Sequence, residues 1–247
     1  MPYSTIIKLN SDRSYKKFNG QQVHGLLYNL LSSEESELAN NIHEKYEIKP
    51  ITASIIFEGI PCLRFTFLEQ EIVDVFLKAC LKKENFPLNL GKEKISPNKI
   101  ITSGGNKLSN HCKYEDMLGI NKKTFEMKFI TPTTFRKGKL NHPLPDLETM
   151  FKGLIRKWNL FSGYQYNKEK ILEYVNKHLA ITRHDIKSDI IKYKDHMQVG
   201  FIGTIEGKIF DENTDLQEKI QSLVEFSYYA GVGYKTTMGM GQVVLQS

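Results

Sequence analysis

The chain has 247 residues, of which 40% are hydrophobic and 25% charged, and its mean hydropathy is -0.39. These values are typical of a globular protein with an apolar core, and they exclude a disordered or collagen-like chain. No apolar run approaches the roughly 18 residues that cross a bilayer, and residues 1–13 do not resemble a secretory signal, so we expect a cytoplasmic protein. The three cysteines form no Cys-x-x-Cys pair and are expected to be free thiols: Cys62, Cys80 and Cys112.

The net charge of +6 is unevenly distributed along the sequence. Residues 1–77 contain 7 basic and 10 acidic side chains, residues 78–139 contain 14 and 5, and residues 140–247 contain 13 and 13. The whole excess therefore lies in the central block, as expected for a surface that contacts a phosphate backbone. A solvated lysine-rich loop region would give the same pattern, so charge alone leaves both interpretations open.

The first half of the chain shows strand and helix patterns in a β-α-β-β-α-β order. Apolar residues recur at helical spacing after Gly20, and Ser-Ser-Glu-Glu at 32–35 has the pattern of a capping box that begins a second helix. Residues 58–61 have the composition of a hairpin turn. The predicted strands are 3–9, 51–57, 63–68 and about 94–102, and the predicted helices are about 20–31, 34–46 and 71–83. This order predicts a ferredoxin-like domain, which we place at 1–115.

The second half repeats this order with one extra helix. The predicted strands are 125–130, 180–193, 197–206 and 242–245, and the predicted helices are about 147–158, 168–178 and 216–226. The two halves share no visible sequence repeat, so a second ferredoxin-like domain over 116–247 is inferred from element order alone. We therefore expect an α+β protein made of tandem ferredoxin-like domains.

The most specific local pattern lies near the end of the sequence. Gly231, Gly233, Gly239 and Gly241 form a Gly-x-Gly-x5-Gly-x-Gly segment around Lys235, which we call the glycine segment. Such a segment allows positive φ angles, so its N–H groups can face phosphates. A helix pattern precedes it and Gly-x-x-x-x-Gly-Lys-Ser/Thr is absent, which excludes a dinucleotide fingerprint and a P-loop. A glycine-rich turn in a crowded sheet is the structural alternative.

Candidate acid–base residues lie on the first two predicted helices. The histidines form no His-Glu-x-x-His pattern and no Gly-x-Ser-x-Gly is present, which leaves metal-free acid–base chemistry. His24 and Tyr28 are four residues apart and border the apolar stripe of one helix, and His43 borders that of the next. Each of them alone is more typical of a boundary residue than of a catalyst.

The sequence resembles the CRISPR-associated endoribonucleases that process precursor CRISPR RNA, in the repeat-associated mysterious protein superfamily. The glycine segment is similar to the signature of that superfamily, and residues 25–28, 38–44 and 131–145 resemble its first helix, its helical histidine segment and its central stretch. The resemblance implies tandem ferredoxin-like domains, no cofactor and no metal. It also implies cleavage within the CRISPR repeat, in which the 2′-OH attacks the neighbouring phosphorus and leaves 2′,3′-cyclic phosphate and 5′-OH ends.

The same resemblance implies a cleavage site made of Tyr28, His43 and Lys49. His43 is expected to protonate the leaving 5′-oxygen, Lys49 to stabilise charge on the phosphorane, and Tyr28 to orient the 2′-OH. An alternative site uses His24 with His43, because an imidazole one helical turn before Tyr28 is suited to act as the base.

The implied partner is CRISPR repeat RNA within precursor crRNA. Arg136, Lys137, Lys139 and the glycine segment with Lys235 are expected to contact it, mainly through phosphates. A CRISPR effector complex and a homodimer are further partners to test, and no membrane contact is expected. A non-catalytic RNA-binding subunit of an effector complex is the main alternative function, and an enzyme acting on a phosphorylated small molecule is a weaker one. The spacing of Tyr28, His43 and Lys49 favours the nuclease.

Overall fold

The computed structural model describes residues 1–10, 15–57, 59–82 and 86–246. The chain folds into two compact units, each built from two stretches of sequence. Unit 1 consists of Met1–His111 with Thr236–Gly239, and unit 2 consists of Cys112–Lys235 with Met240–Ser247. The glycine segment therefore contributes residues to both units.

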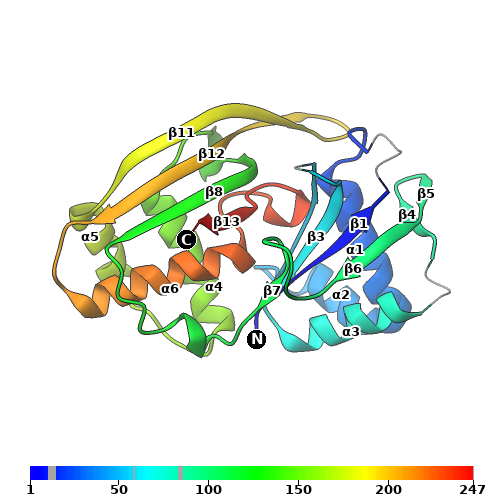
Figure 1. Cartoon of the computed structure of the whole chain (residues 1–247), viewed down its shortest axis with the longest axis horizontal. Helices are drawn as coiled ribbons and strands as arrows, with labels where there is room; N and C mark the ends of the chain where they lie inside the picture. Colours follow the sequence, from blue (N-terminus) through cyan, green and yellow to red (C-terminus); the bar gives the residue numbers. More distant parts are fainter. Residues whose placement is uncertain (11–14, 58, 83–85, 247) are drawn as a thin grey trace. The chain divides into compact units, whose positions relative to one another are not determined.

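Unit 1 contains a five-stranded antiparallel sheet, in which four strands follow the order β2-β3-β1-β6 and a short fifth strand, β7, is also paired to β1 (Figure 1). In chain order its elements are β1 (Tyr3–Leu9), α1 (Gly20–Glu34), α2 (Ser36–Glu44), β2 (Ile51–Ile56), β3 (Cys62–Phe67), α3 (Gln70–Leu81), β4 (Leu88–Leu90), β5 (Glu93–Ile95), β6 (Pro97–Ile101) and β7 (Asn110–His111). Counting β6 as the fourth strand, this is the 4-1-3-2 order of a ferredoxin-like fold.

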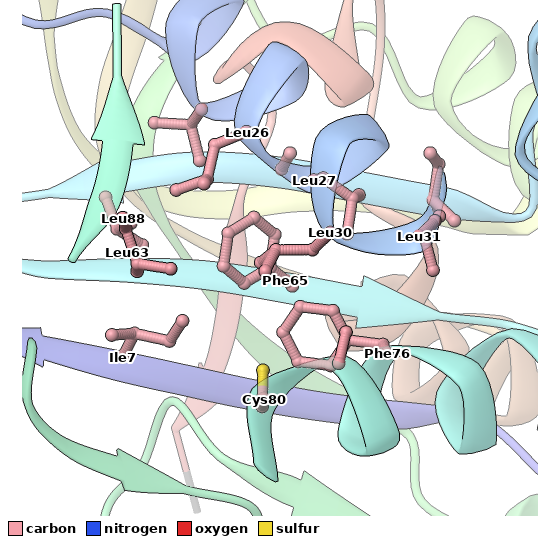
Figure 2. Packing of buried hydrophobic residues seen from close by; sticks show 14 of the residues in the cluster. Ile7, Leu26, Leu27, Leu30, Leu31, Leu63, Phe65, Phe76, Cys80 and Leu88 are labelled. Carbon is pink, nitrogen blue, oxygen red and sulfur yellow. The ribbon is translucent and has the colours of Figure 1, made fainter. Parts of the chain in front are cut away.

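The core of unit 1 lies between α1, α3 and one face of this sheet. The α1 residues predicted from helical spacing are buried, namely Val23, Leu26, Leu27, Leu30 and Leu31. They pack with Phe65 of β3 and Phe76 of α3, whose ring centroids are 5.2 Å apart (Figure 2). Because each such side chain contributes about 1.5–3 kcal/mol when buried, this stripe fixes which face of α1 is left for chemistry.

The capping box is not where the sequence predicted it. Helix α1 continues past the Ser-Ser pair, and α2 begins after Glu35, whose side chain makes no cap hydrogen bond. The box forms instead at the start of α1, where the Asn19 side chain accepts from the Gln22 N–H and the Gln22 side chain accepts from the Asn19 N–H. Asn is as good an N-cap as Ser, so the earlier pair satisfies the first turn of the helix.

The single strand predicted over 94–102 is in fact two strands. Strand β5 pairs with β4 in a separate two-stranded ribbon, while β6 begins at Pro97 and pairs with β1. Proline has no N–H to donate to a ladder, which explains why the chain changes partner there. Position 58 of the predicted hairpin turn and position 83 of the predicted helix lie outside the described residues.

Unit 2 has a four-stranded antiparallel sheet in the order β11-β12-β8-β13, the same 4-1-3-2 order, with helices on one face (Figure 1). Its elements are η2 (Glu115–Met117), β8 (Thr124–Thr133), β9 (Phe135–Lys137), β10 (Leu140–His142), α4 (Leu147–Phe161), α5 (Lys168–His178), β11 (Leu179–Lys192), β12 (Met197–Ile209), α6 (Thr214–Ala230) and β13 (Val243–Gln246). The short helix η3 (Thr236–Met238) belongs to unit 1.

The core of unit 2 is centred on Trp158 of α4, which is fully buried. Its ring centroid lies 5.2 Å from that of Tyr166, 5.3 Å from that of Phe226 on α6, and 5.7 Å from that of Tyr114. Such aromatic pairs add about 0.5–1.5 kcal/mol each beyond their burial. The predicted apolar stripe of α4 is therefore the face that holds α4 and α6 together. The strand orders of the two sheets confirm the predicted tandem ferredoxin-like units.

Candidate active site

Helices α1 and α2 bring three of the predicted site residues into ring contact within unit 1. His24 and Tyr28 lie one turn apart on α1, and their ring centroids are 4.7 Å apart. His43 near the end of α2 meets the Tyr28 ring edge-on, at 5.3 Å between centroids and 88° between planes. The Tyr28 ring thus contacts both imidazoles, which the sequence spacing alone did not establish.

The backbone of the η3 turn holds His24. Its Nδ1 lies 3.1 Å from the carbonyl oxygen of Thr237. Because a carbonyl oxygen can only accept, this bond assigns the proton to Nδ1 and leaves the lone pair of the neutral ring on Nε2. Burial lowers the pKa of His24, the charges of His43 and Lys49 lower it further, and only the bond to Thr237 opposes them. His24 is therefore a neutral imidazole with Nε2 ready to accept a proton.

The η3 turn reaches His24 because Gly20 lets it approach α1. A Cβ at position 20 would lie 2.1 Å from the carbonyl oxygen of Met238 and 2.4 Å from the Cα of Gly239. Real Cβ atoms essentially never come that close to backbone atoms, so only glycine fits at the start of α1. Glycine at position 20 therefore allows the η3 turn to place the Thr237 carbonyl next to His24.

Tyr28 is a neutral phenol with an unused hydroxyl. Burial raises the pKa of Tyr28 to about 12, so the side chain is a poor base near neutral pH. Its buried hydroxyl has no hydrogen-bond partner among the described residues. A buried donor left unpaired typically costs about 1–3 kcal/mol, which makes this hydroxyl a candidate to bond a substrate atom.

Lys49 holds the end of α2. Its Nζ donates to the carbonyl oxygens of Ile42 and His43, at 2.5 and 2.6 Å. These carbonyls lie in the last turn of the helix, where backbone acceptors have no partner in the helix and cations are favoured. Partial burial lowers the pKa of Lys49. Lys49 thus fixes the backbone that carries the His43 ring, and one of its three N–H groups is left for another acceptor.

The glycine segment uses several of its own N–H groups. Those of Val232, Tyr234, Met240 and Gly241 donate to backbone carbonyls within unit 2, so for these residues the expectation of amides facing phosphates is wrong. All four glycines of the segment have positive φ angles, as predicted. Gly233 also permits close approach, since a Cβ there would lie 2.5 Å from the Thr134 carbonyl oxygen.

Known proteins with similar sequences and structures indicate the family that this chain resembles. The family model of CRISPR-associated endoribonuclease Cas6 matches residues 127–243. A CRISPR-associated endoribonuclease Cas6 of Streptococcus thermophilus is 24% identical over 226 residues, which is 90% of this chain and 89% of that protein. A Cas6 structure described as a product complex matches 100% of this chain and 99% of its own, at 25% identity and a TM-score of 0.90.

The chain is similar to the Cas6 family over residues 127–243 and to Cas6 proteins along nearly its whole length. A structure of Thermus thermophilus Cas6, 24% identical over 100% of this chain and 98% of its own, has a TM-score of 0.81 and supports the fold. The predicted resemblance and the predicted class, an endoribonuclease, are therefore confirmed. In the described part of the chain, no group of three or more His, Cys, Asp and Glu side chains could hold a metal ion. No helix within the described ranges is long and apolar enough to cross a membrane.

The basic residues predicted to contact RNA differ in their partners, all within unit 2. Lys137 is paired with Asp146, which also caps the start of α4, so much of its charge is compensated. Arg136 donates to the hydroxyl of Tyr234 at 2.9 Å and stacks on that ring. Lys139 is exposed. Arg136 is thus better placed than Lys137 to meet an added anion.

Two residues that build the site were missed by sequence reasoning. Thr237 supplies the carbonyl that fixes the tautomer of His24 from 213 positions away, and Gly20 allows that approach. The available signal was a glycine directly before an apolar helical stripe and a Thr-Thr pair inside the glycine segment. Neither pattern says which distant segment it contacts.

Proposed function

We propose that this protein, which is similar to Cas6 endoribonucleases, cleaves precursor CRISPR RNA within the repeat, without metal, by attack of the RNA 2′-OH. The observation that carries the proposal is the bond from His24 to the Thr237 carbonyl, which leaves Nε2 unprotonated on a ring that contacts Tyr28, and the Tyr28 ring also contacts His43. RNA carries its own nucleophile, so a protein needs only to move two protons and stabilise charge on phosphorus.

In this mechanism His24 is the base and His43 is the acid. Nε2 of His24 takes the 2′-OH proton as the 2′-oxygen bonds to phosphorus, and the bond from phosphorus to the 5′-oxygen breaks. The imidazolium of His43 donates its proton to that oxygen, which leaves as a 5′-OH. The other product end is a 2′,3′-cyclic phosphate. The lowered pKa of His24 favours the base role, because a neutral ring is needed to accept the proton.

This proposal favours the two-histidine site over the predicted Tyr28, His43 and Lys49 triad. Tyr28, with its pKa raised to about 12, is a hydrogen-bond donor instead of a base, and its unpaired hydroxyl is available to the scissile phosphate or the 2′-oxygen. Lys49 acts mainly as a positioning residue, because two of its three donors are used by Ile42 and His43. Its charge also helps to keep His24 neutral.

The test is cleavage of the cognate repeat RNA in excess chelator. We expect the wild type to cleave under these conditions and to leave 2′,3′-cyclic phosphate ends. His24→Ala and His43→Ala should each lower the cleavage rate by about 10²–10⁴-fold, the usual size of a general acid–base contribution, while RNA binding persists. His184→Ala, which removes an exposed histidine on β11, is the matched control and should cleave normally.

Three results would contradict the proposal in different ways. Intact RNA from the folded wild type would favour a non-catalytic binding subunit. A requirement for magnesium would refute the mechanism but not the activity. A deep loss in Tyr28→Phe together with a nearly normal rate in His24→Ala would restore the tyrosine-containing triad. Cytoplasmic location, an effector complex and a homodimer stay predictions.

A further inference from the structure

A cluster of cations and aromatic rings lies within unit 2, at the tip of the hairpin formed by β11 and β12. The Nζ of Lys235 lies 4.4 Å from the centroid of the Tyr193 ring, 5.6 Å from that of Tyr234, and 2.7 Å from Nε2 of His196. The Arg136 guanidinium lies 5.1 Å from the centroid of the Tyr234 ring. We call these five residues the hairpin cluster.

The backbone of Lys235 indicates that its side chain has a role. Its φ angle is 55°, and it is the one non-glycine residue with positive φ in the part of the chain that the structure describes. The four glycines of the same segment adopt positive φ without a Cβ penalty. Glycine at 235 would do the same, so the segment retains a strained lysine where the backbone alone would favour glycine.

The hairpin tip is a formed platform for the Lys235 ammonium. The Tyr193 N–H donates to the His196 carbonyl at 2.9 Å, and the two rings stack at 5.0 Å between centroids. Because an ammonium can only donate, the contact with Lys235 requires Nε2 of His196 to be unprotonated. One ring face and one neutral imidazole therefore hold the ammonium, and its remaining N–H groups are available to a ligand.

Two other lysines of unit 2 have a carboxylate partner, whereas the cations of the hairpin cluster are held by groups that carry no negative charge. Lys137 is paired with Asp146, and Lys123 with Glu212. The groups that hold Lys235 and Arg136 in the cluster are instead rings, an imidazole and a phenol hydroxyl, which orient a cation and leave its charge in place. Two such cations beside the single Tyr234 ring suit the phosphodiesters of one nucleic-acid strand.

We propose that Tyr193 and His196 are positioning residues for RNA binding, which hold Lys235 against a backbone phosphate while Tyr234 holds Arg136 against a second one. This deepens the proposed function, since it rests on RNA being the substrate. It assigns the β11–β12 hairpin tip a share of the RNA affinity, independent of the bond-breaking step.

The test measures binding with an RNA that cannot be cleaved. The probe is a fluorescein-labelled RNA of the CRISPR repeat from the source genome, with 2′-O-methyl groups in place of every 2′-OH, and anisotropy is followed over a salt series. Lys235→Ala should weaken binding by roughly tenfold and reduce the salt slope by about 1, the value for one lost phosphate contact. Tyr193→Leu should move both quantities in the same direction, and Tyr193→Phe, which keeps the ring, should restore them.

The matched control is Lys194→Ala, which removes an exposed lysine from the same hairpin tip. The proposal is overturned if Lys235→Ala and Lys194→Ala have the same salt slope, because general charge would then explain the effect.

Lys235→Gly, which relieves the strained φ, distinguishes a structural role of Lys235 from a role in RNA binding. We expect it to melt no lower than the wild type and to bind RNA weakly; a lower melting temperature with unchanged binding would overturn the proposal. Cleavage of unmodified RNA by the wild type is scored separately, so failure of the proposed function is distinguishable.

Discussion

Replacing Gly20 with alanine tests the link between the η3 turn and His24. The added Cβ would lie 2.1 Å from the Met238 carbonyl oxygen, which is 1.3 Å less than the 3.4 Å at which ordinary van der Waals contact begins. The obstacle is backbone, so the turn must move by about that distance. A comparable movement of the neighbouring Thr237 carbonyl breaks its 3.1 Å bond to His24. Misplacement of a reacting group by about 1 Å costs on the order of 10²-fold in rate.

We therefore expect Gly20→Ala to lower the single-turnover rate of repeat cleavage about 10²-fold. Overpacking should also lower the free energy of unfolding by about 1–3 kcal/mol, measured by urea titration. Gly153→Ala is the control, because a Cβ at this position on α4 would have nothing within 4 Å. It should raise the free energy of unfolding by about 0.5–1 kcal/mol and leave cleavage unchanged. A folded Gly20→Ala variant that cleaves at the wild-type rate would refute the reasoning.

Three further predictions follow from the titratable groups. Lys49→Met should move the acidic limb of the pH–rate profile to higher pH, because the Lys49 charge lowers the pKa of His24. Lys45→Met is the control and should leave the limb in place. An acidic limb that Lys49→Met does not move would contradict this prediction. Tyr28→Phe should raise the free energy of unfolding by about 1 kcal/mol in urea titrations, because it removes an unpaired buried hydroxyl, and a clear loss would show that the hydroxyl is satisfied. Burial lowers the pKa of Lys157 from 10.5 to about 8, so between these values the unfolded chain holds a proton that the folded protein has lost. The free energy of unfolding of the wild type should then rise with pH over that range, and that of Lys157→Met should rise less. If the two plots of unfolding free energy against pH are parallel, the lowered pKa of Lys157 is contradicted.

Much of the fold could be predicted because its determinants are local and periodic. The stripe of α1 and the stripe of α4 each follow from a spacing of three and four residues, and each is buried as expected. The predicted position of the capping box was wrong because Ser-Ser-Glu-Glu and the pair of Asn19 and Gln22 are equally good local patterns, and only packing decides between them.

The chemistry of the site could be predicted only in part. Sequence spacing put His24 and Tyr28 on one face, but the choice of which one assists His43 depends on burial and on a carbonyl 213 residues away. Lys49 has the right residue type for stabilising a phosphorane, yet most of its donors are directed to backbone carbonyls at the end of α2. Both facts arise from long-range packing, which no spacing rule contains.

The assignment of base and acid is tested most directly by an RNA whose leaving 5′-oxygen at the mapped cleavage position is replaced by sulfur. A thiolate leaves without needing a proton, so an acid is dispensable for this substrate and a base is not. His43→Ala should therefore recover a rate close to that of the wild type on the sulfur substrate, while His24→Ala should stay slow. Recovery of His24→Ala and no recovery of His43→Ala would contradict the assignment.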